Sequence, residues 1–171
     1  MGFTPTSGIM MGTRSGDLDP GVLVHLLRDG RMSVGELDEL LNRRSGLVGV
    51  SETSPDMRDL LAREASDERA ADAVALFVHL AKKAVGALAA TLGGIQTLVF
   101  SGGIGERSPI VRARITRGLE HLGVRLDDAK NDAGASVIST DASACTVRII
   151  PTDEESVIAR QALSVVAASR G

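Results

Sequence analysis

Aromatic side chains are nearly absent from this sequence. The 171 residues include no tryptophan, no tyrosine and 3 phenylalanines. The chain therefore lacks the stacking surfaces with which many proteins bind bases and sugars. Hydrophobic residues still make up 43% of the sequence, so aliphatic side chains must form the core. Ligand recognition is expected to depend on backbone groups and on charge.

Cysteine and clustered positive charge are also scarce. The single Cys145 has no partner in the chain for a disulfide or a zinc pair, and it is expected to pack as a small hydrophobe. The net charge is -3, with no long basic run. Neither nucleic acid nor an anionic membrane surface is therefore expected as the main partner.

Targeting and membrane signals are missing as well. Met1 and the residues after it show no basic start, apolar core or small-residue cleavage site, which predicts a cytoplasmic location. The longest apolar stretch, about residues 70–94, contains Asp72, Lys82 and Lys83. Because crossing a bilayer would bury these charges, the stretch is expected to be a buried core helix.

Helix signals fill the first half of the chain. Asp19 before Pro20 predicts a helix to about residue 28. The capping-box spacing of Ser33 and Glu36 predicts a second, with Gly46 available to end it. A cap at residues 54–55 predicts a third that ends near residue 66, and apolar spacing predicts a long helix over about 67–92.

Two short β-type runs follow, at residues 96–100 and 145–150. The first enters a glycine turn and then a helix from about 108 to 122, and the second enters a turn and a further helix. Strands that alternate with helices predict an α/β fold with its ligand at the carboxyl ends of the strands. The whole chain, residues 1–171, is expected to form one domain or one large lobe.

The glycine turn at residues 101–106 has the sequence SGGIGE. It would let a ligand approach the backbone closely, and the helix after it would point free amides toward a phosphate. It is neither a Walker A loop nor a complete dinucleotide fingerprint. Considered alone, the turn is equally consistent with a tight structural connection.

Two charged positions have competing explanations. Arg14 lies between glycines in the run GTRSG, where its guanidinium could bind phosphate or carboxylate, or could form a surface salt bridge with Asp17. Glu154 could hold magnesium beside a phosphate site. Its neighbours Thr152 and Glu155 have capping-box spacing, however, and spacing alone favours a structural role for this acidic run.

Three segments together resemble one enzyme family, the acetate kinases (acetokinase family). They are residues 10–20 (MMGTRSGDLDP), 99–106 (VFSGGIGE) and 150–155 (IPTDEE), in the order in which that family has them. The resemblance covers essentially the whole chain. It implies the C-terminal, nucleotide-binding and dimerisation portion of such an enzyme, without its N-terminal domain. The implied fold is the C-terminal domain of the actin, Hsp70 and sugar-kinase (ribonuclease H-like) fold.

The resemblance also implies roles for individual residues. Arg14 would be catalytic and would stabilise the transferring phosphoryl group, and Glu154 would bind Mg²⁺. The residues implied to bind the nucleotide are Asp56, Met57, Arg58, Gly103, Ile104, Gly105, Glu106 and Arg107. The family usually has asparagine where this chain has Arg107, a long cation in place of a neutral amide.

The activity that the resemblance implies is reversible phosphorylation of acetate by ATP, giving acetyl phosphate and ADP, in a homodimer. The isolated chain is expected to be inactive, because in-line transfer needs both walls of the cleft to position donor and acceptor. The alternative is a fragment that binds nucleotide or forms dimers without catalysis.

Overall fold

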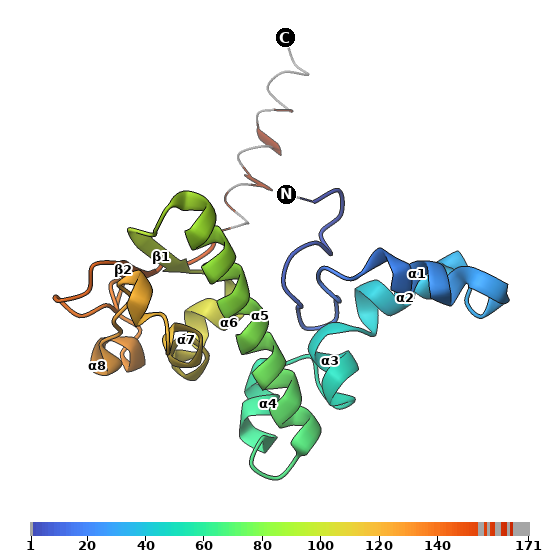
Figure 1. Cartoon of the computed structure of the whole chain (residues 1–171), viewed down its shortest axis with the longest axis horizontal. Coiled ribbons are helices and arrows are strands. Elements are labelled where there is room, and N and C mark those ends of the chain that lie inside the picture. The colour runs from blue at the N-terminus through green and yellow to red at the C-terminus, as the bar shows by residue number, and fades with distance from the viewer. Residues whose placement is uncertain (1, 154–155, 157, 160–161, 164, 166–171) are drawn as a thin grey trace. The chain divides into compact units, whose positions relative to one another are not determined.

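The computed structural model describes residues 2–153, 156, 158–159, 162–163 and 165. By its internal contacts the chain divides into two compact units. The helical unit comprises Met1–Ile95 with Arg114–Arg117, and the sheet unit comprises Gln96–Ala113 with Gly118–Gly171. Figure 1 labels the elements of both.

The helical unit is built on one long helix, α5 (Glu68–Leu92). Before it come α1 (Pro20–Leu27), a 3₁₀ turn (Arg28–Gly30), α2 (Val34–Arg43), α3 (Gly46–Ser51) and α4 (Met57–Arg63). Both α3 and α4 pack on α5, while α2 packs on α1. Small alanines of α5 let the backbones approach, and Leu47, Leu60 and Val74 are fully buried at 0% exposure.

The expected core helix is therefore present, but it is buried mainly in its first half. Leu88 and Leu92, near its end, are 62% and 73% exposed. Of the residues described, α5 is the one helix long and apolar enough to cross a membrane. Core helices of soluble proteins meet the same criterion, so this is weak support for a membrane span.

Three of the helix starts are confirmed. Asp19 accepts from the Gly21 amide, Ser33 and Glu36 form the reciprocal capping box, and Asp67 caps α5. The prediction of a cap at residues 54–55 was wrong, since α4 begins later. Asp56 caps it by accepting from the Arg58 amide at 2.8 Å, and the Ser54 hydroxyl instead donates to Asp59.

Gly46 does not end the second helix; it begins α3, which the sequence did not predict. Its φ of 63° lies in the left-handed region that favours glycine. A Cβ at this position would overlap the carbonyl oxygen of Met11. The residue thus allows the segment before α1 to run directly against the start of α3.

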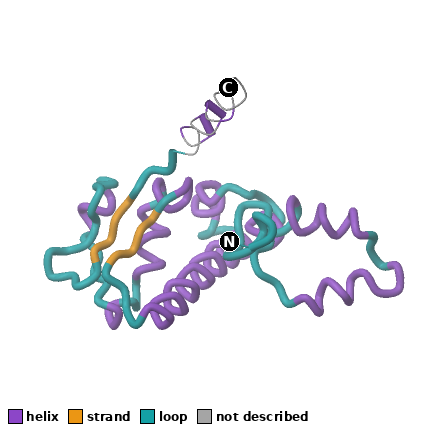
Figure 2. The backbone as a smooth tube through the Cα atoms, turned by 90° about the horizontal axis from the view of Figure 1, so that it is seen from above, coloured by secondary structure: helices purple, strands orange, loops and turns teal. Residues whose placement is uncertain are grey.

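The sheet unit contains two parallel strands, β1 (Thr97–Phe100) and β2 (Thr146–Ile149), which lie side by side in Figure 2. Both were predicted. α6 (Gly102–Arg107) and α7 (Pro109–Thr116) follow β1, and a 3₁₀ turn (Glu120–Leu122) and α8 (Asp128–Asp132) come before β2. Cys145 is buried as expected, and burial raises the pKa of its thiol.

Two predictions for the segment after β1 need correction. The glycine run is itself a short helix, α6, and not an open turn. The helix that starts after Ser108 ends at Thr116 and does not continue to Leu122. Gly118, with a φ of 85°, interrupts it.

Arg112 of α7 is 1% exposed and links three helices, α6, α7 and α8. Its guanidinium donates to the Gly105 and Glu106 carbonyls at 2.9 and 2.8 Å, at the end of α6. It also donates to the side chain and the carbonyl of Asn131 in α8, both at 2.8 Å. Burial lowers the pKa of Arg112, and these acceptors stabilise its charged form.

We expect Arg112→Met to lower the free energy of unfolding of the sheet unit by about 3 kcal/mol, because it leaves several buried acceptors without donors. Urea denaturation followed by circular dichroism suits this chain, which has no tryptophan or tyrosine. Arg125→Met, at an exposed position of the same unit, is the control and should change little. Equal denaturation midpoints for the two variants would contradict the role of Arg112.

Candidate functional site

Backbone hydrogen bonds hold the loop that carries Arg14 against α3. The Ser45 amide donates to the Thr13 carbonyl at 3.0 Å, and the Leu47 amide donates to the Met11 carbonyl at 2.9 Å. Within the loop, the Met11 amide donates to the Arg14 carbonyl at 3.0 Å. The Arg14 backbone therefore belongs to a closed, internally bonded loop.

The same loop lies against the segment before α4. A Cβ on Gly12 would come within 2.9 Å of the Pro55 carbonyl oxygen, so the two backbones are nearly in contact. Pro55 directly precedes Asp56. The helical unit therefore brings together two of the predicted site segments, residues 10–15 and residues 56–58.

The Arg14 side chain is half-buried, and within the described part of the chain its guanidinium has no hydrogen-bond or ion-pair partner. The alternative salt bridge with Asp17 is not formed. Asp17 accepts from the Gly8 amide at 2.8 Å and the Ser7 hydroxyl at 3.0 Å, and these bonds lower the pKa of its carboxyl. The positive charge of Arg14 is thus available to an anion from outside the loop.

Asp56 and Arg58 neutralise each other at the start of α4. Arg58 Nη2 lies 2.6 Å from Asp56 Oδ2, and this side-chain bond is the main cause that lowers the pKa of Asp56 to about 2. Met57 between them is 3% exposed and packs in the core. The side chains of Asp56 and Arg58 are therefore the groups of this segment that a ligand can reach.

In the sheet unit, the predicted nucleotide residues Gly103, Ile104, Gly105, Glu106 and Arg107 form most of α6. The sequence predicted free amides here, but the Gly102 amide is occupied, since it donates to the Glu106 carboxylate at 2.8 Å and to the Thr152 hydroxyl at 2.9 Å. Gly103 is exposed, and a Cβ added there would meet no atom within 4 Å. The Arg107 side chain, at the end of α6, is also exposed.

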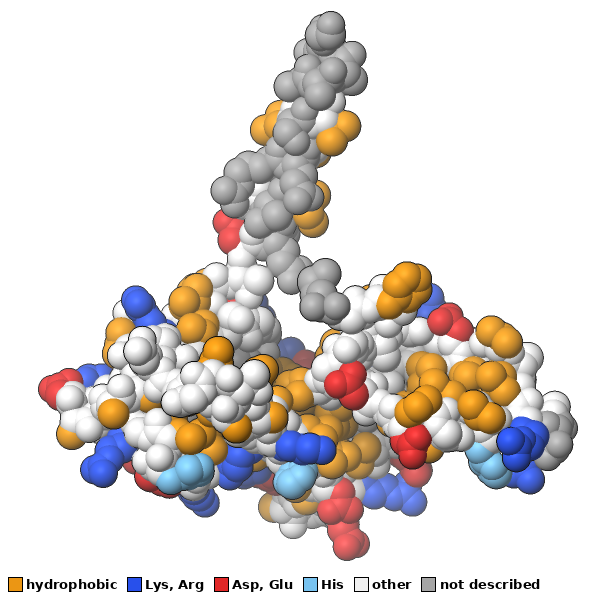
Figure 3. All heavy atoms as spheres, turned by 45° about the horizontal axis from the view of Figure 1, so that its top comes forward, with side chains coloured by type: hydrophobic (Ala, Val, Ile, Leu, Met, Phe, Trp, Pro, Cys, Tyr) orange, Lys and Arg blue, Asp and Glu red, His pale blue; other side chains and the backbone are white. Residues whose placement is uncertain are grey.

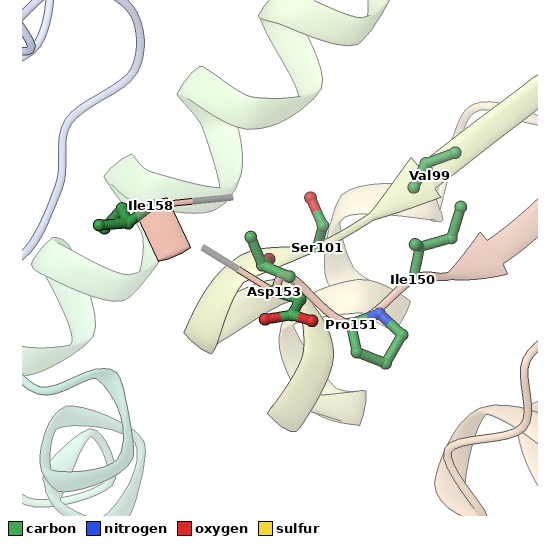
Figure 4. A pocket seen from close by; sticks show the side chains of 7 residues that line it. Val99, Ser101, Ile150, Pro151, Asp153 and Ile158 are labelled. Carbon is green, nitrogen blue, oxygen red and sulfur yellow. The ribbon is translucent and has the colours of Figure 1, made fainter. Parts of the chain in front are cut away.

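A cavity of about 610 Å³ opens where the two strands end. Figure 4 shows Val99 and Ile150 on its strand side, with Ser101 and Asp153 just beyond the strand ends. Pro151, Thr152 and Ile158 complete the lining. The walls are mostly apolar, and the polar groups gather at the carboxyl ends of the strands, where the α/β pattern predicted a ligand.

The predicted magnesium residue Glu154 lies outside the described residues, as does Glu155 of the predicted capping box. Asp153 makes a cap itself, because its carboxylate accepts from the Ser156 amide at 3.1 Å and from its hydroxyl at 2.6 Å. No group of three or more metal-ligating side chains occurs in the described residues. Mg²⁺ is commonly held by one or two carboxylates together with substrate phosphates. The polar side chains of Thr152 and Asp153 offer only oxygen atoms, so this loop is chemically compatible with Mg²⁺.

The predicted site residues thus fall into two groups. Arg14 and residues 56–58 belong to the helical unit, and residues 103–107 belong to the sheet unit together with Thr152. Sequence reasoning missed the hydrogen bond that Thr152 makes with Glu106 and the role of Gly46. A glycine between two short helical patterns was the only available signal for the latter.

Comparison with known proteins shows extensive similarity. The model of the acetokinase family matches residues 1–160. An acetate kinase of Leifsonia xyli is 49% identical over 98% of this chain and 43% of its own length. Acetate kinase of Porphyromonas gingivalis has a TM-score of 0.87 and 39% identity, over 97% of this chain and 43% of its own.

A propionate kinase of Francisella tularensis is also similar in structure, with a TM-score of 0.83 and 35% identity over 91% of this chain and 40% of its own. These similarities confirm the predicted α/β class and the actin, Hsp70 and sugar-kinase fold. The chain spans less than half the length of the relatives that it matches.

We expect Gly46→Ala to lower the free energy of unfolding of the helical unit by about 2 kcal/mol, because a Cβ there is strained and overlaps the Arg14 loop. Gly35→Ala is the matched control, since Gly35 lies in α2 with open space around it. Alanine there should be neutral or slightly stabilising. Urea denaturation of both variants tests this, and similar stabilities would show that the loop does not depend on Gly46.

Proposed function

The chain belongs to the acetokinase family, and on that premise we propose that it supplies the arginine, nucleotide and magnesium part of an acetate kinase active site. The whole protein would transfer the γ-phosphoryl group of ATP to acetate, reversibly, giving acetyl phosphate and ADP. The observation that carries the proposal is Arg14, a guanidinium on a closed loop with no partner among the described residues.

Arg14 would act on the phosphoryl group during transfer. Charge spreads over the equatorial oxygens of this group in the transition state, and a fixed guanidinium stabilises it without reorganisation at the moment of reaction. A planar fork with several N–H donors suits phosphate oxygens. The hydrogen bonds between residues 11–14 and α3 support this role because they hold the backbone that carries the side chain.

The nucleotide would contact α6 and the start of α4. Open space at Gly103 supports the first contact, because the fold alone does not demand glycine there. The residues proposed to form or support the nucleotide-binding segments are Gly103, Ile104, Gly105, Glu106 and Arg107 of the sheet unit and Asp56, Met57 and Arg58 of the helical unit. The exposed cation Arg107 would replace the amide usual in the family.

Magnesium would be held by Glu154, which follows Asp153 in the sequence. When bound, the ion would neutralise charge on the β- and γ-phosphates. Glu154 follows Thr152 closely in the sequence, and the Thr152 backbone is hydrogen-bonded to Glu106 at 2.8 Å. Thr152, two residues before the proposed metal residue Glu154, is thus in direct contact with Glu106 of the proposed nucleotide segment.

We also propose that the whole protein works in the cytoplasm as a homodimer. Exposed apolar side chains over α1 and α2, visible in Figure 3, support an interface. No residue of α1 is buried, and Val22, Val24 and Val34 are 47%, 55% and 74% exposed.

The arginine role is tested by grafting this chain in place of the matching part of the Leifsonia xyli acetate kinase. We expect the chimera to form acetyl phosphate and Arg14→Ala to lower its kcat by about a thousandfold, as loss of a phosphoryl-clamping arginine does. Arg43→Ala, which removes an exposed arginine of α2, is the control. Near-normal turnover of the Arg14 variant would exclude the role.

The nucleotide role of α6 is tested with Gly103→Ala. Because Gly103 has open space and lies in a helix, alanine should leave the chain at least as stable, with an unchanged or higher melting temperature. We expect it to weaken binding of ATP in excess magnesium by about tenfold, since the methyl group would occupy space that the ligand needs. Calorimetric titration measures this, and unchanged affinity would place the nucleotide elsewhere.

A further inference from the structure

One carboxylate oxygen joins the segments that follow the two strands. Glu106 Oε1 accepts from the Thr152 amide, the Thr152 hydroxyl and the Gly102 amide, each at 2.8 Å. The Gly102 amide also reaches the Thr152 hydroxyl at 2.9 Å. These three residues form a closed hydrogen-bonded group, which we call the strand-end clamp.

The clamp links parts of the chain that are far apart in sequence. Gly102 comes two residues after Phe100, the end of β1, and Thr152 comes shortly after Ile149, the end of β2. Glu106 and Thr152 are separated by 46 residues. The two strands are already paired, and the clamp extends their alignment beyond the last strand residues into both loops.

Glu106 accepts these bonds as a carboxylate. The amide of Thr152, and next its hydroxyl, lower the pKa of the Glu106 carboxyl, so the charged form is favoured near neutral pH. Charge-assisted hydrogen bonds are stronger than neutral ones. Three donors on one oxygen leave that oxygen with little capacity for a ligand.

We infer that Glu106 is a positioning residue and not a direct ligand contact. Through Thr152 it holds the loop after β2 in a fixed position relative to α6. Side-chain oxygens of that loop and the backbone of residues 103–105 would then face the same nucleotide phosphates. This inference rests on the proposed function, since it assumes that α6 binds the nucleotide. Thr152 is exposed, so its side chain does not form part of the core of the sheet unit.

The test is a double-mutant cycle on the 171-residue chain, with binding of ATP in excess magnesium measured by calorimetry. Glu106→Ala should weaken binding about tenfold, and Thr152→Val by less, because valine keeps the backbone amide that donates to Glu106. The double variant should be no weaker than Glu106→Ala alone, because the Thr152 hydroxyl acts through the Glu106 carboxylate. Thr152→Ser keeps the hydroxyl and should recover most of the affinity. Asp141→Ala, an exposed acid of the same unit, is the control.

Additive losses in the double variant would show that Glu106 contacts the nucleotide itself and would overturn the inference. If the loss of affinity followed the loss of melting temperature from variant to variant, the clamp would be purely structural. That result would also overturn the inference. If the unmodified chain binds no ATP, the proposed function of α6 fails instead. If the amides of Gly102 and Thr152 were then protected from hydrogen exchange, the clamp would serve stability alone. That result again contradicts the inference.

Discussion

The buried guanidinium of Arg112 is the interaction on which the sheet unit depends. α6 has 6 residues, too few to be stable as a helix in isolation. Its last carbonyls, those of Gly105 and Glu106, would lack partners in the interior without the N–H donors of Arg112. The same side chain holds Asn131 of α8. Fixed donors and acceptors thus offset the cost of burying a charge, and they set where the glycine segment lies.

The helical unit solves a similar problem with backbone groups. A loop that is already ordered before a ligand binds to Arg14 loses less backbone entropy on binding. Hydrogen bonds from α3 to the carbonyls of Met11 and Thr13 supply this order. They form only because Gly46 allows two backbones to approach closely. Gly46 therefore determines the position of the backbone that carries Arg14.

Sequence patterns predicted what depends on local spacing. The caps at Asp19, Ser33 and Asp67 and the two strands follow from residue types a few positions apart. Long-range partners were not predictable in this way. Arg112 resembles an ordinary surface residue of an amphipathic helix, and its burial depends on Asn131, 19 residues later. The ligand roles of the site residues rest on the resemblance, since no spacing rule distinguishes Glu154 from a helix-capping acid.

Three arginines of this chain show how environment decides what a guanidinium can do. Arg112 is buried and donates to carbonyl and amide oxygens of α6 and α8, so its charge serves the fold. Arg58 is exposed, but a carboxylate 2.6 Å away cancels most of its field. Arg14 is half-buried on a rigid loop and has no partner within the described residues, so its field is neither cancelled nor committed to packing. An incoming anion would gain most from the last arrangement, because binding it would displace no ion pair among the described residues.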